Sequence, residues 1–493
     1  MNRRNVWAAY SDKRIKEAYD FAEEYKQFLN ISKTERECVD TIVNEAEERG
    51  FVELARLIED GKTLSPGDKV YAVWMNKTVI LMKIGHQPME NGMNILGAHI
   101  DSPRLDVKQN PLYEDSGLAY LDTHYYGGIK KYLYVTLPLA LHGVIVRKDG
   151  TTAILNIGED EDDPVFFISD LLIHLSQEQM AKKTSEAVTG EALDLVVGNK
   201  PFIIDSGKND EEDEDDTLTR GQMYAARQEK AEQSESKKLR GAVKRAVLAI
   251  LKDEYDVEED DFISAELEIV PAGKARDAGL DRSMILSYGQ DDRACAYPSL
   301  RAIFEAGDVD RTACCILVDK EEIGSVGATG MRSMFFENTI AEIMNLTGTY
   351  SELGLRRCLA ASRMLSSDVS AAYDPLYAEA YEKRNSAYFG RGIVFNKYTG
   401  ARGKSGSNDA NAEYVGWIRR AMDDRKVAFQ TAELGRVDVG GGGTIAYISA
   451  AYGMNVVDAG VAVLNMHAPM EVTSKADIYE ARNAYIAFLE AQE

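Results

Sequence analysis

Five short stretches, far apart in the sequence, carry residue types that can bind metal ions and move protons. The densest is residues 319–325, in which Glu321 and Glu322 stand side by side after the apolar run 312–318. Adjacent side chains diverge, so one carboxylate can bind a cation while the other accepts a proton. In a chain this acidic, the same residues can also form an ordinary surface turn.

A second stretch, residues 94–103, ends an apolar run with His99 and Asp101. Two residues apart in a strand, these side chains lie on the same face. Neutral imidazole is a common metal ligand, and a carboxylate beside it can fix its tautomer. The alternative is a strand-end histidine that is capped by an aspartate.

Three further stretches supply more carboxylates and a second histidine. Asp291 and Asp292 precede a predicted helix, Asp368 follows an apolar run, and His467 follows the apolar run 456–465. Two histidines, three ligating carboxylates and one spare glutamate are what a two-metal hydrolase needs. Nitrogen and oxygen ligands without thiolate suit zinc, or cobalt or manganese in its place.

Two glycine-containing stretches resemble phosphate loops without matching them. Residues 403–405 read Gly-Lys-Ser, but Tyr398 stands where the first glycine of that motif belongs. Residues 440–443 are four glycines without the required lysine. We interpret the second stretch as a flexible loop close to a substrate.

Composition limits the class of protein. The chain has 493 residues, of which 45% are hydrophobic, and its formal net charge is −24, which argues against a nucleic-acid partner. No apolar run approaches the roughly 20 residues of a membrane helix, and the N-terminus lacks the pattern of a signal peptide. The five cysteines have no zinc-finger spacing, so we expect reduced packing residues in a cytoplasmic protein.

The elements that must position these residues are typical of an α/β fold. Apolar residues at helical spacing predict a first helix, and Ser32 with Glu35 matches a capping box for a second, with Ile31 placed for a hydrophobic staple. We expect a mixed sheet flanked by helices, built from residues 1–106 and 262–493. Its predicted helices and strands include residues 12–30, 70–75, 78–84, 262–271 and 475–491.

Residues 107–261 differ in character, because tyrosines and β-branched residues dominate them. These residues favour strands and interfaces, so we predict an inserted β-rich domain through which a large homo-oligomer is built. Its acidic run 208–216 is typical of a solvated loop, since the spacing is not that of an EF-hand calcium site. A helix from about residue 237 to residue 255 is expected to lead back to the main domain.

Together, the five stretches resemble the aspartyl-aminopeptidase family of di-zinc metallo-aminopeptidases, particularly its bacterial members. The resemblance covers nearly the whole chain and rests on five motifs: Gly97 to Pro103, Asp291-Asp292-Arg293, Asp319 to Ser325, Ser366-Ser367-Asp368, and Met466 to Pro469. It implies two zinc ions held by His99, Glu322, Asp368 and His467, with Asp291 bridging them. It also implies Glu321 as general base and Asp101 as the residue that orients His99.

The resemblance further implies a tetrahedral homododecamer, built from dimers, that encloses the active sites and admits short peptides. In such a shell His124, in the inserted domain, can reach a neighbouring subunit's active site. The alternative for His124 is a surface histidine flanked by tyrosines.

Two positions depart from the family pattern. Residues 369–375 contain no histidine, where aspartyl-specific members carry them, and Asp292 replaces the usual asparagine. The resemblance therefore leaves the preferred N-terminal residue open. We expect removal of the N-terminal residue from short peptides. The alternatives are a di-metal deacylase or carboxypeptidase, or a non-catalytic metal-dependent assembly protein, although a structural site has no need for the spare base Glu321.

Overall fold

The computed structural model describes residues 4–202 and 239–492. The acidic run 208–216 and the first two residues of the helix predicted from residue 237 lie outside the described residues. The chain divides into two compact units. Unit 1 comprises Met1–Arg104, Tyr126–Ile129 and Gly273–Glu493, and unit 2 comprises Leu105–Tyr125 and Lys130–Ala272.

A nine-stranded mixed sheet forms the centre of unit 1. Its four middle strands, β13, β4, β14 and β18, run parallel, and the flanking strands β3 and β16 pair antiparallel with them. The carboxyl ends of parallel strands meet at one edge of a sheet, where α/β folds bind their ligands. The strand order is β1 (Val52–Glu53), β2 (Lys69–Trp74), β3 (Thr78–Lys83), β13 (Ala313–Val318), β4 (Asn94–His99), β14 (Arg363–Ser366), β18 (Asn455–Gly460), β16 (Ile393–Asn396) and β17 (Phe429–Thr431).

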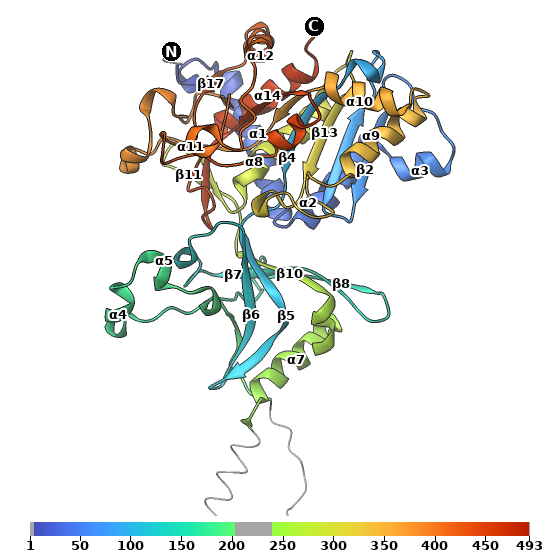
Figure 1. Ribbon diagram of the computed structural model, residues 1–493. Helices are drawn as coiled ribbons and strands as arrows, with labels where there is room; N and C mark the ends of the chain where they lie inside the picture. The colour runs from blue at the N-terminus through green and yellow to red at the C-terminus, as the bar shows by residue number, and fades with distance from the viewer. Residues whose placement is uncertain (1–3, 203–238, 493) are drawn as a thin grey trace, which may run out of the picture. The chain divides into compact units, whose positions relative to one another are not determined.

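Helices cover both faces of this sheet, which confirms the predicted α/β class (Figure 1). Successive strand residues point to opposite faces, so Leu81 and Cys315 pack in one core while Ile80 and Cys314 pack in the other. All five cysteines are buried and free, as predicted. The first core includes α1 (Asp12–Ile31), α2 (Glu35–Glu48), α8 (Gln290–Glu305), α12 (Ala412–Asp424) and α14 (Lys475–Leu489); the second includes α3 (Leu54–Glu59), α9 (Phe335–Leu346), α10 (Glu352–Ala361) and α13 (Ala446–Ala450).

The capping box of α2 lies two residues later than predicted. Thr34, not Ser32, is the N-cap: its hydroxyl accepts a hydrogen bond from the Glu37 backbone N–H at 3.2 Å, and the Glu37 carboxylate accepts one from Thr34 N–H at 3.0 Å. Ile31 is 59% exposed, so the predicted hydrophobic staple does not form. The reason is that α1 continues through Ile31, which leaves only Ser32 to Thr34 to turn the chain.

A second, five-stranded sheet in unit 1 carries the C-terminal histidine. His467 lies in the connection between β19 and β20, which pair antiparallel. Strand β20 also pairs with β12, which leads into α8. This sheet therefore brings the loops around His467 and Asp291 into one region. Its order is β11 (Arg276–Ala278), β12 (Met284–Ser287), β20 (Glu471–Ser474), β19 (Ala462–Leu464) and β15 (Ser370–Ala371).

Unit 2 contains a six-stranded sheet and short helices. Strand β10 begins at Ala265 rather than at the predicted residue 262, because Glu259–Ser264 form a 3₁₀ helix. The described helix that precedes it, α7, spans Ala242–Tyr255. The sheet order is β8 (Thr152–Ile157), β7 (Leu139–Val146), β10 (Ala265–Pro271), β5 (Arg104–Asp115), β6 (Leu118–Tyr126) and β9 (Leu195–Gly198), and the short helices are α4 (Gln177–Met180) and α5 (Thr184–Ala187).

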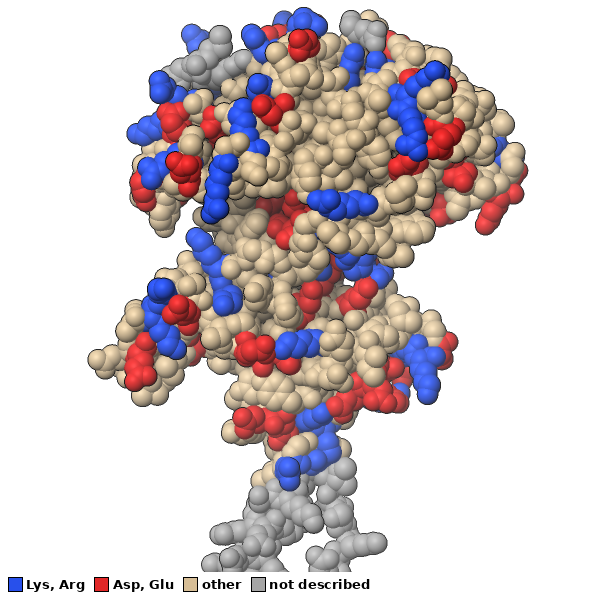
Figure 2. Space-filling model, viewed as in Figure 1, with Lys and Arg blue, Asp and Glu red and all other residues tan. Residues whose placement is uncertain are grey.

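Charged side chains are mixed on the face of the molecule shown in Figure 2. Lysine and arginine side chains lie among aspartates and glutamates rather than in one continuous basic surface. Among the described helices, none combines the length and the apolar character needed to cross a membrane.

The capping box gives a prediction for local stability. Thr34→Ala removes the N-cap hydroxyl and should destabilise the start of α2 by about 1 kcal/mol. Native-state hydrogen exchange should then show about fivefold faster exchange of the first amides of α2. Thr34→Ser keeps the hydroxyl and serves as the matched control. Equal exchange in the two variants would show that the hydroxyl does not cap the helix.

Candidate metal centre and active site

Four of the predicted site residues lie at, or just after, the carboxyl ends of neighbouring parallel strands. His99 is the last residue of β4, Glu321 and Glu322 open a 3₁₀ helix just after β13, and Asp368 comes two residues after β14. Strand β4 lies between β13 and β14 in the sheet. The sheet order therefore brings these four side chains to one edge, although more than 200 positions separate His99 from the glutamates.

The Asp291 carboxylate lies between the two predicted histidine ligands. Its Oδ1 is 3.2 Å from His99 Nε2, and its Oδ2 is 3.3 Å from His467 Nε2. Glu322 Oε2 lies 3.4 Å from the same His467 nitrogen. One oxygen facing each histidine is the arrangement that a carboxylate needs to bridge two cations.

Two overlapping groups of side chains have ligand atoms close enough to hold a metal ion. His99, Asp291 and Glu322 form one group, and His99, Asp292 and Asp368 form the other, with the ligand atoms of each group within 4.8 Å of one another. No ligand role was predicted for Asp292 from its sequence context. Its carboxylate is completely buried, and its Oδ2 accepts a long hydrogen bond of 3.4 Å from His99 N–H. Asp292 is therefore a further candidate ligand.

The electrostatics of the site fit bound cations. Within the described residues, the buried oxygens Asp291 Oδ1 and Glu322 Oε1 accept no hydrogen bond. Burial, reinforced by neighbouring carboxylates, raises the pKa of Glu322 and of Asp368 well above their usual range. Divalent cations would supply the missing partners of these oxygens and offset the repulsion. The imidazole and carboxylate donors, without thiolate, are a set that zinc accepts in hydrolases.

Asp101 is completely buried, and its carboxylate contacts both the His99 ring and the backbone of the paired glutamates. Its Oδ1 lies 3.3 Å from His99 Nδ1, which leaves the Nε2 atom of that imidazole facing Asp291. The two carboxylate oxygens also accept the backbone N–H groups of Glu321 and Glu322, at 3.1 and 3.2 Å. Tyr126, which the sequence analysis did not single out, donates its hydroxyl to Asp101 Oδ2 at 2.8 Å.

Glu471 is a second residue that the sequence analysis missed. Its Oε2 accepts the Asp291 N–H at 2.9 Å, and its Oε1 accepts the His467 N–H at 2.8 Å. Burial raises the pKa of this carboxyl to about 8. The sequence offers one local sign of this buried role: Glu471 stands between two apolar residues, Met470 and Val472. Glu471 thus fixes the backbone of two predicted ligands at once.

Glu321 faces the cavity but belongs to neither candidate metal group. Burial raises its pKa to about 7, which suits a group that accepts and returns a proton near neutral pH. The cavity has a volume of about 500 Å³, and it is also lined by Gly441, Gly442 and Gly443. The glycine loop that was predicted to lie near a substrate is therefore part of the cavity that holds the candidate ligands.

His124 belongs to unit 2, and its side chain is exposed. Its Nδ1 lies 2.8 Å from the backbone oxygen of Tyr125, and the two rings stack with their centroids 5.4 Å apart. A role for His124 in a neighbouring subunit stays a prediction.

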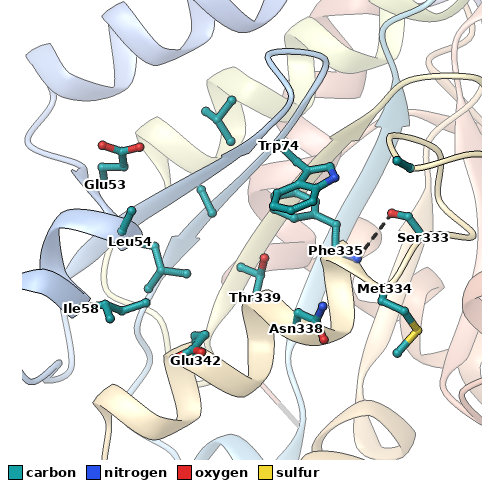
Figure 3. Close-up of a pocket in the computed structure, with 14 residues that line it drawn as sticks. Glu53, Leu54, Ile58, Trp74, Ser333, Met334, Phe335, Asn338, Thr339 and Glu342 are labelled. Atoms are coloured by element: carbon teal, nitrogen blue, oxygen red, sulfur yellow. Dashed lines mark hydrogen bonds between the residues drawn. The ribbon is translucent and has the colours of Figure 1, made fainter.

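A second cavity in unit 1 has a different character (Figure 3). It is an apolar groove of about 370 Å³ in which Trp74 stacks on Phe335, with Leu54, Ile58 and Thr339 nearby. No histidine is present among its described lining residues, and its two glutamates, Glu53 and Glu342, are exposed. The candidate metal ligands therefore line the cavity around His99 and not this groove.

The Glu471 contacts give a prediction for metal affinity. Glu471→Gln replaces one accepting oxygen by an NH₂ group, which cannot accept the N–H of Asp291 or His467. Loss of such a supporting contact should weaken zinc binding by roughly 10–100-fold. Competition with a chelator would measure the zinc affinity, with the exposed Glu413→Gln on α12 as control. Unchanged affinity in Glu471→Gln would contradict the positioning role.

Comparisons with known proteins identify the family of this chain. The sequence matches the family described as "Aminopeptidase I zinc metalloprotease (M18)" over residues 28–489. A probable M18 family aminopeptidase 1 of Clostridium acetobutylicum is 55% identical over 486 residues, which cover 99% of this chain and 98% of that protein.

Solved structures give the same result. The crystal structure of an M18 family aminopeptidase from Thermotoga maritima has a TM-score of 0.88 at 40% identity, with 100% of both chains covered. The more distant mApe1 of S. cerevisiae shares the fold, with a TM-score of 0.71 at 18% identity over 95% of this chain and 96% of that one. From the family match and the full-length identity to its relatives, we conclude that this chain belongs to the M18 family of zinc metallo-aminopeptidases.

Proposed function

We propose that the chain removes the N-terminal residue of short peptides by a two-metal mechanism with Glu321 as general base. The observation that carries this proposal is the position of Asp291, whose two oxygens face different histidines at 3.2 and 3.3 Å. An aminopeptidase of this kind needs two cations, a bridging carboxylate and one carboxylate that binds neither cation. The described cavity contains residues for each of these roles.

Each cation would take one histidine, one terminal carboxylate and one oxygen of Asp291. The contacts favour Glu322 with His467 for one cation, and Asp368 with His99 for the other. We infer that both cations are zinc and that cobalt or manganese can replace them. When bound, they supply Lewis acidity that polarises the scissile carbonyl and lowers the pKa of the attacking water.

Glu321 would move the proton. Its carboxylate accepts a proton from water as the water oxygen bonds to the scissile carbon, and it then delivers that proton to the leaving amine as the C–N bond breaks. The Asp101 carboxylate accepts a hydrogen bond from the backbone N–H of Glu321 at 3.1 Å and so fixes the backbone position from which the Glu321 side chain extends. This position matters because proton transfer needs the Glu321 carboxylate within hydrogen-bond distance of the water.

The acidic character of the cavity supports an exopeptidase. Glu321, Glu322, Asp368 and Asp458 line it, and none of its described lining residues is a lysine or arginine. A C-terminal carboxylate would find no cationic side chain among these lining residues, whereas a free N-terminal ammonium group would meet carboxylates. This polarity favours an aminopeptidase over a carboxypeptidase.

The two neighbouring glutamates give the sharpest test. Glu321→Gln should keep its metal content and lose roughly 10²–10⁴-fold in turnover, the usual contribution of general acid–base catalysis. Glu322→Gln should instead lose metal. Each variant is the other's matched control, because both change one carboxylate to an amide in the same turn. If metal analysis finds the reverse pattern, the roles of the two glutamates are exchanged.

We also propose that the chain assembles into a tetrahedral homododecamer of dimers through residues 107–261. The support is twofold. Unit 2 exposes large apolar side chains, with Ile154, Ile173 and Met180 more than two-thirds exposed, and such surfaces mark interaction sites. The structure of the related mApe1 of S. cerevisiae is described as a dodecamer. A closed shell would admit short peptides and let His124 reach a neighbouring active site.

A cytoplasmic location fits the cysteine chemistry. All five cysteines are free and buried, and unpaired thiols are typical of reducing compartments. We therefore propose that the protein works in the cytoplasm.

Light scattering tests the assembly. The mass of the purified protein should be twelve times the 54.6 kDa of one chain. A shell stabilised by apolar contacts should also keep this mass at high salt, which screens exposed charges. A monomer at micromolar concentration with full peptidase activity would contradict both the shell and any catalytic role of His124.

A further inference from the structure

A third cavity of unit 1 is basic, although the whole chain carries a formal net charge of −24. It has a volume of about 600 Å³ and shares no described lining residue with the cavity around His99. Its walls come from residues 383–391, from the edge strand β17 and from α12 (Figure 1). None of its described lining residues is an aspartate or a glutamate, whereas four are cationic: Lys383, Arg384, Arg391 and Arg419.

Three of these cations lack a carboxylate partner. In the described parts of the chain, no aspartate or glutamate oxygen lies within 4.0 Å of the charged nitrogens of Lys383, Arg391 or Arg419. The fourth cation, Arg384, lies 3.4 Å from Glu382, and its side chain is 90% exposed. A cavity that is lined by one sign of charge attracts ions of the opposite sign. The basic cavity is therefore suited to an anion.

Arg391 shows this lack of partners most clearly, because its side chain is half-buried. Another half-buried arginine of unit 1, Arg301, lies within 4.0 Å of three glutamates. The guanidinium of Arg391 instead lies over the ring of Tyr388, with its Cζ atom 4.2 Å from the ring centroid. Among the described residues it donates no hydrogen bond. Its N–H groups are therefore available to a ligand.

The wall that carries Arg391 is held in place by buried polar side chains. Gln430 is 5% exposed; its Oε1 accepts the Tyr388 N–H at 2.9 Å, and its Nε2 donates to the Tyr388 backbone oxygen at 2.8 Å. Asp477 is completely buried and accepts the N–H groups of the two glycines that flank Arg391, at 2.8 and 2.7 Å. Because this wall is already ordered, a ligand would lose little affinity to the ordering of its site.

Linked phosphate groups match this arrangement. A guanidinium presents its N–H donors in a planar fork that fits phosphate oxygens, and Arg391 and Arg419 each supply one such fork. A single phosphate group carries at most about two negative charges near neutral pH, fewer than the three cations without a partner. The cavity volume of about 600 Å³ is typical of pockets that hold small molecules. An anion with two or three linked phosphate groups satisfies both the charge and the volume.

We propose that this basic cavity is a second ligand site, which binds small molecules that carry two or three linked phosphate groups. Lys383, Arg391 and Arg419 bind the phosphate oxygens, and the hydroxyl of Thr431, also in the lining, can donate a neutral hydrogen bond. The site is independent of the proposed peptidase mechanism, because no candidate metal ligand lines it.

Calorimetry on the zinc-loaded full chain tests the site, with inorganic tripolyphosphate as the probe. We expect one tripolyphosphate to bind per chain, about tenfold or more tightly than orthophosphate, because its charge matches the three cations. Adenosine triphosphate is the second probe. Tighter binding than that of tripolyphosphate would indicate a nucleotide ligand, and equal or weaker binding would indicate that the phosphate chain alone is recognised. Absence of saturable binding of both probes at millimolar concentration would overturn the proposal.

Phosphate chains also bind zinc, so variants must locate the bound anion. Arg391→Gln and Arg419→Gln each remove one guanidinium, and each should weaken tripolyphosphate binding by about tenfold or more, the effect of losing a hydrogen bond to a charged group. Arg420→Gln is the matched control. It removes the same charge from the next residue of α12, which is exposed and lies outside the cavity lining.

The three variants separate the outcomes. Unchanged binding in both Arg391→Gln and Arg419→Gln would place the anion elsewhere, for example on zinc, and would overturn the proposal. An equal loss in Arg420→Gln would show only non-specific attraction and would also overturn it. Zinc content and thermal unfolding without the probe check that each variant keeps its metal and its fold. Arg419 is exposed, so its variant tests the site even if the loss of the contact with Tyr388 destabilises Arg391→Gln.

Discussion

The structure of this site is governed by the repulsion among carboxylates that are buried together. Asp291, Asp292, Glu322 and Asp368 lie within reach of His99 or His467, with little water to screen them. Without cations, this arrangement raises the pKa of Glu322 and Asp368 because burial disfavours their charged forms. In the proposed site, two divalent ions would be coordinated by these same crowded carboxylates. The need to hold these groups together explains the supporting contacts around them.

The scaffold positions these carboxylates through hydrogen bonds to the backbone of the loops that carry them. It does not pair each carboxylate with a cationic side chain. Asp101 accepts the N–H groups of Glu321 and Glu322, and Glu471 accepts those of Asp291 and His467. The parallel strands supply the edge at which these loops meet. This division leaves the oxygens of the candidate ligands free for metal, and it leaves Glu321 free for the proposed proton transfer.

Local sequence signals predicted the parts of the fold that depend on local physics. Apolar runs identified the buried strands before His99 and Glu321, and helical spacing identified α1. The capping box was placed two residues early, because both Ser32–Glu35 and Thr34–Glu37 fit its pattern and only tertiary packing decides between them. Glu471 was missed because its partner Asp291 is 180 residues away. Asp292 was missed as a candidate ligand because its distance to Asp368 depends on the folded chain.

In the proposed mechanism, two cations on either side of Asp291 act together in the reaction. A zinc titration of the metal-free chain, with metal content and hydrolysis of a leucyl substrate followed in parallel, tests it most directly. We expect two zinc ions to bind per chain and activity to appear as the second site fills. Full activity at one zinc ion per chain, or activity that persists in excess chelator, would contradict it.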